Sequence, residues 1–395
     1  MKIVSADLEQ ENEVIRLSWD DQTSTRFHAL WLRDNAQDEH TRSANNGQRL
    51  ITLADIDPAI RIKNASIEQG QLAISFEPCD TSSVFSPQWL REHSYDRDHV
   101  RSKGRLPNNC ELFDSNLSLD AVTGDFEELI QDQQALLTWL SQLPRFGFAR
   151  LHNGPTESGA LLRVAELIGY IRETNYGKWF EVKSMPSPDN LAYTSLGLQA
   201  HTDNPYRDPV PTLQLLYCLE NSATGGESQV IDGFNAAARL RDLNPHYFHL
   251  LSSHCARFEY LGQESTILQS TMPMIELRAD GELRCIRFNN RSTGAITEVP
   301  FEDMADYYSA YRAFAKIISD PALELSFKLD PGECFVVDNT RVMHARSAFE
   351  LGATEPGAPD EEAKAVGRWL QGCYIERDGL FSEIAVLEKK LQKNS

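Results

Sequence analysis

The sequence has few cysteines and none in a pair of the kind that binds zinc or forms a redox motif. Its 395 residues include seven cysteines, which are widely scattered and never form a C-x-x-C pair. An odd, scattered set argues against a disulfide framework and against a thiolate zinc site. We therefore expect the cysteines to act as small apolar residues in a reducing compartment.

Long apolar runs are also missing. No window approaches the roughly 18–20 consecutive apolar residues that a membrane helix needs. The chain starts MKIVSADLEQENEV, where a single lysine precedes acidic residues and no apolar stretch has the length of a signal peptide. We therefore expect a cytoplasmic protein.

Positive charge is scarce. Lysine and arginine together number 38 against 58 aspartates and glutamates, which gives a formal net charge of −20. Such a field repels phosphate backbones and anionic lipids, so neither nucleic acid nor a membrane is an expected partner. A basic pocket inside an acidic molecule is still compatible with this charge. The phosphate-binding motifs G-x-G-x-x-G and G-x-x-x-x-G-K are absent too, which argues against nucleotide binding.

What is present indicates a globular protein with more than one domain. The apolar fraction is 41% and the charged fraction 24%, near globular averages, and 395 residues exceed what one core usually needs. Residues 1–95 contain alternating stretches, such as 13–19 and 72–76, which predict a small β domain. Residues 96–120 are polar and contain glycine and proline, which predicts a linker before the remaining domain, 121–395.

The large region predicts strands flanked by helices. Apolar residues at helical spacing indicate helices within 126–140 and 160–168, and 146–151 between them has the pattern of a strand. Strands dominate from residue 190 onward, interrupted by a helical stretch near 302–318. The predicted class is mainly β with flanking helices, which fits a barrel or jelly roll better than a doubly wound sheet.

The last predicted element is an amphipathic helix over residues 382–391. It places Ile384, Leu387 and Leu391 on one face, begins at a serine and ends in lysines. This apolar face is compatible with a homodimer.

Two histidines and an aspartate are candidate metal ligands. In His201-Thr202-Asp203, positions i and i+2 of a strand face one side, so an imidazole and a carboxylate can reach one ion. That pair alone arises by chance in a chain of this composition. Residues 329–344 add a turn, an apolar strand and a second turn that delivers His344. Two histidines and one carboxylate leave three open positions on Fe(II), as in non-haem iron oxygenases.

An arginine near the C-terminus is a candidate anion ligand. Arg368 opens the strand 368–374, where a buried guanidinium can bind a carboxylate through two parallel hydrogen bonds. On its own evidence, an arginine on a strand is more often a solvated or ion-paired residue at the edge of a sheet.

Together these residues resemble a known family, the taurine dioxygenase superfamily of Fe(II)- and 2-oxoglutarate-dependent oxygenases. The similar segments are 201–203 (His-Thr-Asp), 224–228 (Thr-Gly-Gly-Glu-Ser), 338–344 and Arg368. The nearest match is the γ-butyrobetaine and trimethyllysine dioxygenase group, whose N-terminal domain has a Trp-Leu-Arg-Asp-Asn segment like residues 31–35. The resemblance covers essentially the whole chain and implies a double-stranded β-helix (jelly roll) catalytic domain.

The resemblance also implies the cofactors and their ligands. The three candidate metal ligands would bind Fe(II), and Arg368 would bind the C5 carboxylate of the co-substrate 2-oxoglutarate, supported by the Ser228 hydroxyl. Arg346 is the rival for that carboxylate. With O2, the implied activity is that of a 2-oxoglutarate-dependent dioxygenase (hydroxylase).

Further positions match the substrate pocket of the family. An aromatic cage holds a trimethylammonium group by cation–π attraction, which survives where hydrogen bonding is impossible. Taken singly, its aromatic residues are more often core residues. The cage would comprise Tyr176, Phe180 (where the family has tryptophan), Tyr193 and Tyr374. Asn190 and Asn289 would bind the acidic end of the substrate.

Two arginines bracket the second of these asparagines. Arg287 and Arg291 flank the Asn289-Asn290 pair and are compatible with surface positions. If either faces the pocket, the site suits a stronger anion, such as a phosphonate.

The chain departs from the family pattern in two places. In much of the family, a cysteine-rich stretch follows the segment that resembles 31–35 and helps to hold a structural zinc ion. Here residues 36–40 are Ala-Gln-Asp-Glu-His and no cysteine precedes Cys79, so we predict no structural zinc. The spacing between His344 and Arg368 is also longer than usual, and 352–359 is predicted to be an inserted surface loop.

The predicted function is hydroxylation of a small quaternary-ammonium acid, with γ-butyrobetaine to carnitine as the leading reaction. The alternatives within the same mechanism are 2-trimethylaminoethylphosphonate and trimethyllysine. Two alternatives from other classes are a small-molecule-binding barrel without redox chemistry and a cupin-like metal-dependent isomerase or hydrolase. Dependence on 2-oxoglutarate and anaerobic Fe(II) binding separate these classes.

Overall fold

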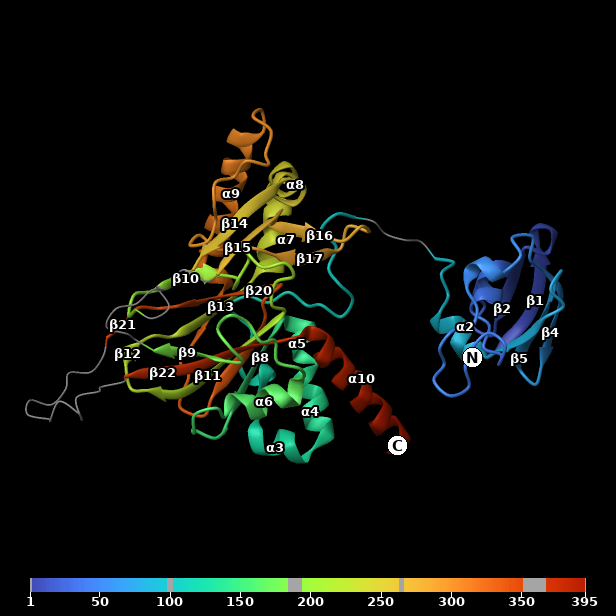
Figure 1. Ribbon diagram of the computed structural model, residues 1–395, viewed down its shortest axis with the longest axis horizontal. Coiled ribbons are helices and arrows are strands. Elements are labelled where there is room, and N and C mark those ends of the chain that lie inside the picture. The colour runs from blue at the N-terminus through green and yellow to red at the C-terminus, as the bar shows by residue number, and fades with distance from the viewer. Residues whose placement is uncertain (1, 98–101, 184–193, 263–265, 351–366, 395) are drawn as a thin grey trace, which may run out of the picture. The chain divides into compact units, whose positions relative to one another are not determined.

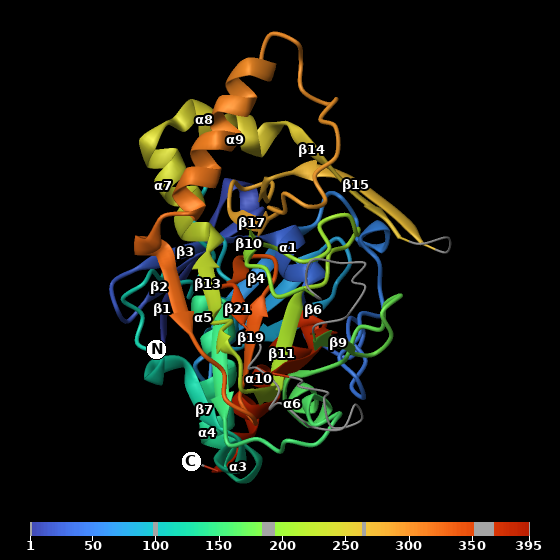
Figure 2. The same cartoon turned by 90° about the vertical axis from the view of Figure 1, so that its left-hand side faces the viewer.

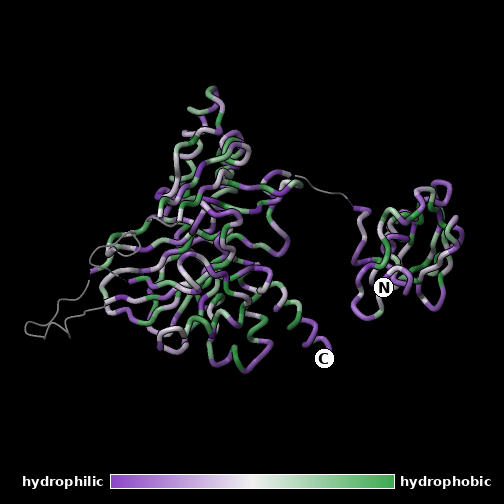
Figure 3. Tube along the Cα trace, viewed as in Figure 1, coloured by the Kyte–Doolittle hydropathy of each residue, from purple (hydrophilic) through white to green (hydrophobic). Residues whose placement is uncertain are grey.

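The computed structural model describes residues 2–97, 102–183, 194–262, 266–350 and 367–394. By its contacts the chain divides into two units, residues 1–100 and 101–395, and hydrophobic segments are gathered within each of them (Figures 1 and 3). Of the segment predicted as a linker, residues 102–120 belong to the second unit. Phe113 in this stretch is buried in a core cluster, an anchor that the polar composition around it conceals.

The first unit is a small β domain, as predicted. It has two three-stranded antiparallel sheets, β1-β2-β3 and β4-β5-β6. Alternate residues of β2 and β5 are buried in a shared apolar core that includes Leu17 and Phe76. The strands are β1 (Ile3–Glu9), β2 (Val14–Trp19), β3 (Ser24–His28), β4 (Arg61–Glu68), β5 (Gln71–Glu77) and β6 (Ser82–Phe85), and the helices are α1 (Ala29–Asp34) and α2 (Pro87–Glu92).

Hydrogen bonds organise the turn after α1, where the family pattern is broken. The Asp38 carboxylate accepts the backbone N–H groups of His40 and Thr41 as well as the Thr41 hydroxyl. The buried Arg33 guanidinium donates to the Thr41 oxygen at 2.8 Å. The side chains of this turn thus satisfy its own backbone donors.

The second unit is built around two facing sheets. The six-stranded sheet has the order β7-β8-β19-β11-β22-β9, and the four-stranded sheet has the order β10-β20-β13-β18. Side chains from both sheets meet in one apolar cluster, which includes Val230 and Phe335, so the sheets pack face to face. This arrangement confirms the predicted jelly roll. The strands are β7 (Thr123–Asp125), β8 (Phe148–His152), β9 (Phe180–Lys183), β10 (Leu198–His201), β11 (Leu213–Asn221), β13 (Ser228–Asp232), β18 (Glu324–Phe327), β19 (Cys334–Asp338), β20 (Val342–Arg346) and β22 (Arg368–Ile375).

Helices cover the outer face of the six-stranded sheet (Figure 1). Because side chains alternate along a strand, β11 sends Leu215 and Tyr217 toward these helices and Gln214 and Leu216 toward the other sheet. The helices are α3 (Phe126–Gln131), α4 (Gln133–Leu140), α5 (Gln142–Phe146), α6 (Leu161–Ile168) and α10 (Arg377–Asn394).

The C-terminal helix uses its apolar face inside the unit. On α10, Leu380 and Leu387 are buried in the cluster beneath the six-stranded sheet, and Ile384 packs against it. The face that was compatible with a homodimer is therefore occupied largely by the chain's own residues.

A second group of helices packs against the outer face of the four-stranded sheet (Figure 2). The region from residue 190 has more helix than predicted, because α7 (Gly233–Leu243) and α8 (Pro245–Ser253) accompany α9 (Met304–Ile318). The signals for both were side-chain caps: Asp232 accepts the Phe234 N–H at the start of α7, and Asn244 caps α8, which begins with a proline. The remaining strands are β12 (Thr224–Gly225), β14 (Cys255–Leu261), β15 (Ile267–Pro273), β16 (Ile275–Leu277), β17 (Leu283–Ile286) and β21 (Phe349–Glu350).

The described residues also bear on the membrane and cysteine predictions. Among them, no helix is both long and apolar enough to cross a membrane. All seven cysteines are free thiols, and those at 218, 285, 334 and 373 are buried. Most of them thus behave as the small apolar residues that the sequence predicts.

Candidate active site

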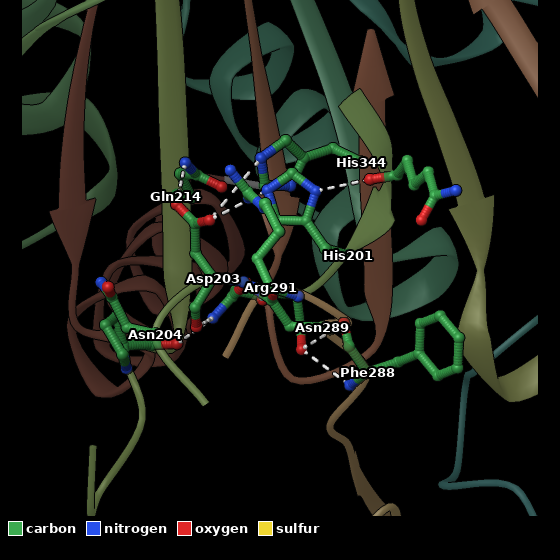
Figure 4. Close-up of polar contacts among 12 residues, drawn as sticks. His201, Asp203, Asn204, Gln214, Phe288, Asn289, Arg291 and His344 are labelled. Atoms are coloured by element: carbon green, nitrogen blue, oxygen red, sulfur yellow. Dashed lines mark hydrogen bonds and ion pairs between the residues drawn. The ribbon is translucent and has the colours of Figure 1, made fainter. Parts of the chain in front are cut away.

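Neighbouring strands of the four-stranded sheet bring the two candidate histidines together. His201 is the last residue of β10 and pairs directly with His344 in the middle of β20. Their ring centroids are 4.3 Å apart. Asp203 follows two residues later, and its carboxylate faces both imidazoles (Figure 4). The candidate ligand atoms of the three residues all lie within 4.8 Å of one another.

The two imidazoles share one carboxylate oxygen. The Nδ1 atom of His201 lies 2.8 Å from the Gln199 carbonyl, which only accepts, so Nδ1–H donates and Nε2 is left facing Asp203. That Nε2 lies 3.2 Å from Oδ1 of Asp203, and the His344 Nε2 lies 3.9 Å from the same oxygen. An imidazole nitrogen and a carboxylate oxygen at this distance attract each other only when a proton or a cation lies between them. The geometry therefore suits a bound cation.

The other oxygen of Asp203 is occupied by hydrogen bonds. Oδ2 accepts from the Gln214 amide at 2.7 Å and from the Tyr374 hydroxyl at 2.9 Å. The backbone is fixed as well, because Asn339 accepts the Asp203 N–H at 2.6 Å and donates to its carbonyl at 3.0 Å. The next residue, Asn204, has a left-handed φ of 52°, which asparagine tolerates better than most residues.

Burial and neighbouring charge set the ionisation of these groups. Burial raises the pKa of Asp203, but its contact with His201 and the nearby charges, including that of Arg291, outweigh this and hold the pKa well below its usual range. Burial and the adjacent His201 lower the pKa of His344 to about 3. At neutral pH the aspartate is ionised and His344 is neutral, which are the forms that bind metal.

Two arginines stand near the triad with different partners. Arg346 ends β20 and Arg368 begins β22, and their Cζ atoms lie 4.9 and 5.6 Å from the centre of the Phe349 ring. Arg346 donates to the Thr194 and Leu196 carbonyls at 2.6 and 2.7 Å. Arg368, by contrast, has no acidic partner among the described residues, and its buried Nε has no hydrogen-bond partner.

The buried Arg368 guanidinium is suited to an anionic ligand. Burial lowers the pKa of Arg368 to about 10, so the side chain is still charged at neutral pH. A buried, unpaired charge is costly unless a counter-ion reaches it. The cavity supplies the access, since Arg368 and the buried Ser228 both line it.

An aromatic cluster forms another part of the cavity wall. The ring centroid of Phe180 lies 5.4 Å from the ring centroid of Tyr374 and 6.1 Å from that of Tyr176. Two rings that the sequence did not single out extend this surface: Tyr260 lies 6.3 Å from Tyr176 and stacks on Tyr206 at 5.0 Å. Three of the four predicted cage residues are thus gathered around one space. The fourth, Tyr193, lies outside the described residues.

The predicted acid-binding residues are placed only in part. Asn289 lines the cavity, but its amide donates to the Thr202 carbonyl and its oxygen accepts the Arg291 N–H, both at 3.1 Å. Asn190 and the predicted insertion 352–359 lie outside the described residues. Of the bracketing arginines, Arg287 pairs with Glu276 and is absent from the cavity wall, whereas Arg291 lines the cavity.

Sequence reasoning missed the residues that orient Asp203 and part of the aromatic wall. Gln214 had a readable signal, because it is the lone amide in the apolar run Leu213–Leu219 of β11. Asn339 lay within the segment that was singled out, but nothing in it indicated a contact with Asp203. Tyr206 and Tyr260 have no local signature, since only the fold brings them to the cavity.

The metal triad, Arg346, Arg368 and the aromatic cluster all line one cavity of about 470 Å³. The donor set fits Fe(II), because two imidazoles and one carboxylate leave further positions open on the ion. The guanidinium of Arg368, which has no acidic partner in the described part of the chain, fits a carboxylate of 2-oxoglutarate in the same space. Apolar side chains, among them Leu216 and Phe335, complete the wall.

The known proteins that this chain resembles are consistent with the chemistry of the site. Residues 111–374 match the family model described as taurine catabolism dioxygenase TauD, TfdA family. Residues 6–117 match the model described as gamma-butyrobetaine hydroxylase-like, N-terminal. The first of these matches covers the metal triad and the three arginines that line the cavity.

Curated relatives span nearly the whole chain. A gamma-butyrobetaine dioxygenase from Pseudomonas sp. strain AK-1 is 35% identical over 95% of this chain and 94% of its own. The gamma-butyrobetaine dioxygenase of Homo sapiens is 28% identical over 97% and 96% of the two chains. A trimethyllysine dioxygenase from Meyerozyma guilliermondii is 28% identical over 95% and 94%. The predicted family is thereby confirmed: this chain belongs to the TauD, TfdA family of dioxygenases.

Proposed function

We propose that this enzyme hydroxylates γ-butyrobetaine to carnitine, with Fe(II), 2-oxoglutarate and O2. The observation that carries the proposal is that one cavity is lined by three kinds of group: a metal triad, a buried guanidinium without an acidic partner among the described residues, and a wall of aromatic rings. The relatives named gamma-butyrobetaine dioxygenase support this substrate.

In this proposal, His201, Asp203 and His344 hold Fe(II). When bound, Fe(II) with 2-oxoglutarate and O2 inserts one oxygen atom into a substrate C–H bond, while 2-oxoglutarate loses CO2 and takes up the second oxygen as succinate. Arg368 holds the C5 carboxylate of 2-oxoglutarate through charge-assisted hydrogen bonds, next to the Ser228 hydroxyl. Arg346 already donates to two backbone carbonyls, which favours Arg368 for this role.

The substrate is oriented by its two unlike ends. Its trimethylammonium group binds against the rings of Tyr176, Phe180 and Tyr374, with Tyr206 and Tyr260 extending the wall. Its carboxylate points toward the region of Asn289. Fixing both ends determines which carbon faces the metal. The surrounding apolar side chains keep water from the reacting atoms.

We also propose that the enzyme works in the cytoplasm, where its seven free cysteines remain reduced. The C-terminal helix α10 gives little support for a homodimer, because it buries Leu380 and Leu387 within its own unit.

The proposal is tested by turnover of the purified full chain with Fe(II) and 2-oxoglutarate. The candidate substrates are γ-butyrobetaine, trimethyllysine and 2-trimethylaminoethylphosphonate, and the readouts are succinate release and product mass. We expect γ-butyrobetaine to gain one oxygen atom with stoichiometric succinate, and His201→Ala to abolish substrate-dependent succinate. Fe(II) binding without any 2-oxoglutarate consumption, or full turnover by the His201 variant, would contradict it.

Arg291 supports a second candidate substrate, 2-trimethylaminoethylphosphonate. Arg291 lines the cavity beside Asn289, and its charge acts on Asp203, His344 and Arg346. A phosphonate has more negative charge and one more acceptor oxygen than a carboxylate, so it gains more from a guanidinium.

The two candidate substrates are distinguished by comparing their kcat/KM values in the unmodified enzyme and in the variant Arg291→Gln. If the phosphonate is the substrate, its kcat/KM exceeds that of γ-butyrobetaine in the unmodified enzyme, and the variant loses this preference. If γ-butyrobetaine is the substrate, the carboxylate is preferred in the unmodified enzyme.

A further inference from the structure

Asp203 has one oxygen directed at the histidines and one held by two donors on the opposite sheet. We propose that Gln214 and Tyr374 form a clamp that limits Asp203 to a single metal-binding oxygen. Both act as positioning residues through Asp203. The inference rests on the Fe(II) site of the proposed function, but it concerns how the ligand is held rather than which substrate is used.

The clamp is built into the register of two strands. Gln214 of β11 and Tyr374 of β22 are directly opposite each other in the antiparallel pair. Both side chains lie on the cavity side of the six-stranded sheet, whereas Leu213 and Cys373, one position away, are buried under the helices. Their donor atoms reach the same Oδ2 at 2.7 and 2.9 Å.

Burial indicates that the Gln214 side chain is there for this contact. Gln214 is 2% exposed within the otherwise apolar run Leu213–Leu219 of β11, and its amide oxygen has no hydrogen-bond partner among the described residues. Burying an amide with one end unsatisfied is destabilising. The gain that offsets this cost is the hydrogen bond from its nitrogen to the ionised Asp203.

A clamp of this kind preserves open positions on the metal. A carboxylate can bind a metal through one oxygen or through both. If Asp203 bound through both oxygens, the three residues would occupy four positions on the metal. Too few positions would then remain for O2 and for 2-oxoglutarate, which binds through two of its atoms. Two donors on Oδ2 satisfy that oxygen and leave Oδ1 for the ion.

Tyr374 also belongs to the aromatic wall, so its ring and its hydroxyl have separate roles. The ring lies 5.4 Å from Phe180, and the hydroxyl donates to Asp203. Tyr374→Phe therefore removes the contact with Asp203 while keeping the ring. A matched control is Tyr176→Phe, which removes another hydroxyl of the same wall, one that contacts Tyr206 rather than Asp203.

The test measures metal binding by the full chain in the absence of substrate. Metal-free protein is titrated anaerobically with Fe(II), and separately with Co(II), whose visible absorption reports the number of ligands. We expect Tyr374→Phe and Gln214→Leu each to raise the Fe(II) dissociation constant by about 10- to 100-fold, the usual cost of losing a partner of a metal ligand. The Co(II) spectrum shifts in both, and Tyr176→Phe matches the unmodified protein.

Folding is checked by the thermal midpoint of the metal-free protein, and the Gln214 variant keeps the test valid if the Tyr374 variant is unstable. Folded clamp variants with dissociation constants within twofold of the unmodified protein, and with its Co(II) spectrum, would overturn the inference. Metal binding as expected without turnover of any trimethylammonium acid would instead overturn the proposed function and leave the clamp standing.

Discussion

At the scale of single residues, two buried arginines of the same cavity differ in what they contact. Arg346 donates to two backbone carbonyls, so its position is explained by the fold. Arg368 has no such partner among the described residues, and an unpaired buried charge destabilises the protein. A buried residue that destabilises the fold and makes no stabilising contact in it is a candidate functional residue.

Replacing Arg368 separates these two effects. We expect Arg368→Met to raise the KM for 2-oxoglutarate by roughly 10- to 100-fold, because hydrogen bonds to a charged group contribute about 1.5–3 kcal/mol. The same change should raise the thermal midpoint of the ligand-free protein, since it removes an uncompensated charge. Arg346→Met is the comparison: it should lower the midpoint, because two backbone carbonyls lose their donor. The reverse order of midpoints would contradict the assignment.

His344 makes stability depend on pH. Burial lowers its pKa from 6.5 to about 3, so between these values the unfolded chain binds a proton that the folded chain does not. The stability that the neutral His344 contributes to the folded protein is fully present above about pH 6.5 and is lost as the pH falls toward 3. For the metal-free protein we expect the free energy of unfolding to be about 2 kcal/mol lower at pH 5 than at pH 7.5 on this account.

Urea unfolding at the two pH values measures this effect. His344→Gln cannot take up the proton, so its loss of stability between pH 7.5 and pH 5 should be smaller by that amount. An equal loss in the variant and in the unmodified protein would show that His344 is not the group responsible.

At the scale of elements, β22 serves the whole cavity. Its inward residues Arg368, Leu370 and Tyr374 contribute a charge, an apolar wall and a ring. Between them lies Gly372, opposite Phe180 of β9. A Cβ at Gly372 would lie 2.5 Å from the Phe180 ring and 2.9 Å from Leu216. The absence of a side chain at Gly372 therefore lets the Phe180 ring approach the strand closely.

Gly372→Ala is expected to displace that ring. We predict a rise in the KM for the trimethylammonium substrate with little change in the KM for 2-oxoglutarate, and a stability loss of about 1–3 kcal/mol from overpacking. Adding Phe180→Leu provides space for the methyl group, so the double variant should regain stability but not substrate affinity. Unchanged substrate KM in the single variant would show that Phe180 is not part of the binding wall.

At the scale of the whole molecule, pattern and family resemblance predicted the architecture and the metal triad. Period-two alternation identified the small β domain, and helical spacing identified α6 and α9. Residue spacing and the resemblance together indicated His201, Asp203 and His344, whose candidate ligand atoms the fold gathers within 4.8 Å of one another. An acidic chain with net charge −20 also contains the basic pocket that its composition allowed, with Arg291, Arg346 and Arg368 in its wall.

What the sequence could not predict depends on contacts between distant strands. The pairing of Gln214 with Tyr374 follows from the register of β11 and β22, which no local pattern encodes. The choice between Arg287 and Arg291 likewise depended on where Glu276 lies. Helices α7 and α8 lie in a region where strand patterns dominate, and their local signals are the caps at Asp232 and Asn244.

The central claim is that two imidazoles and one carboxylate from separate parts of the chain hold one ferrous ion beside Arg368. Anaerobic equilibrium dialysis of the full chain, with bound iron and 2-oxoglutarate quantified together, tests it most directly. The account predicts one Fe(II) per chain, one 2-oxoglutarate in its presence, no bound iron at the same concentration in Asp203→Ala, and iron without 2-oxoglutarate in Arg368→Met. Full iron binding by the Asp203 variant, or undiminished 2-oxoglutarate binding by the Arg368 variant, would contradict it.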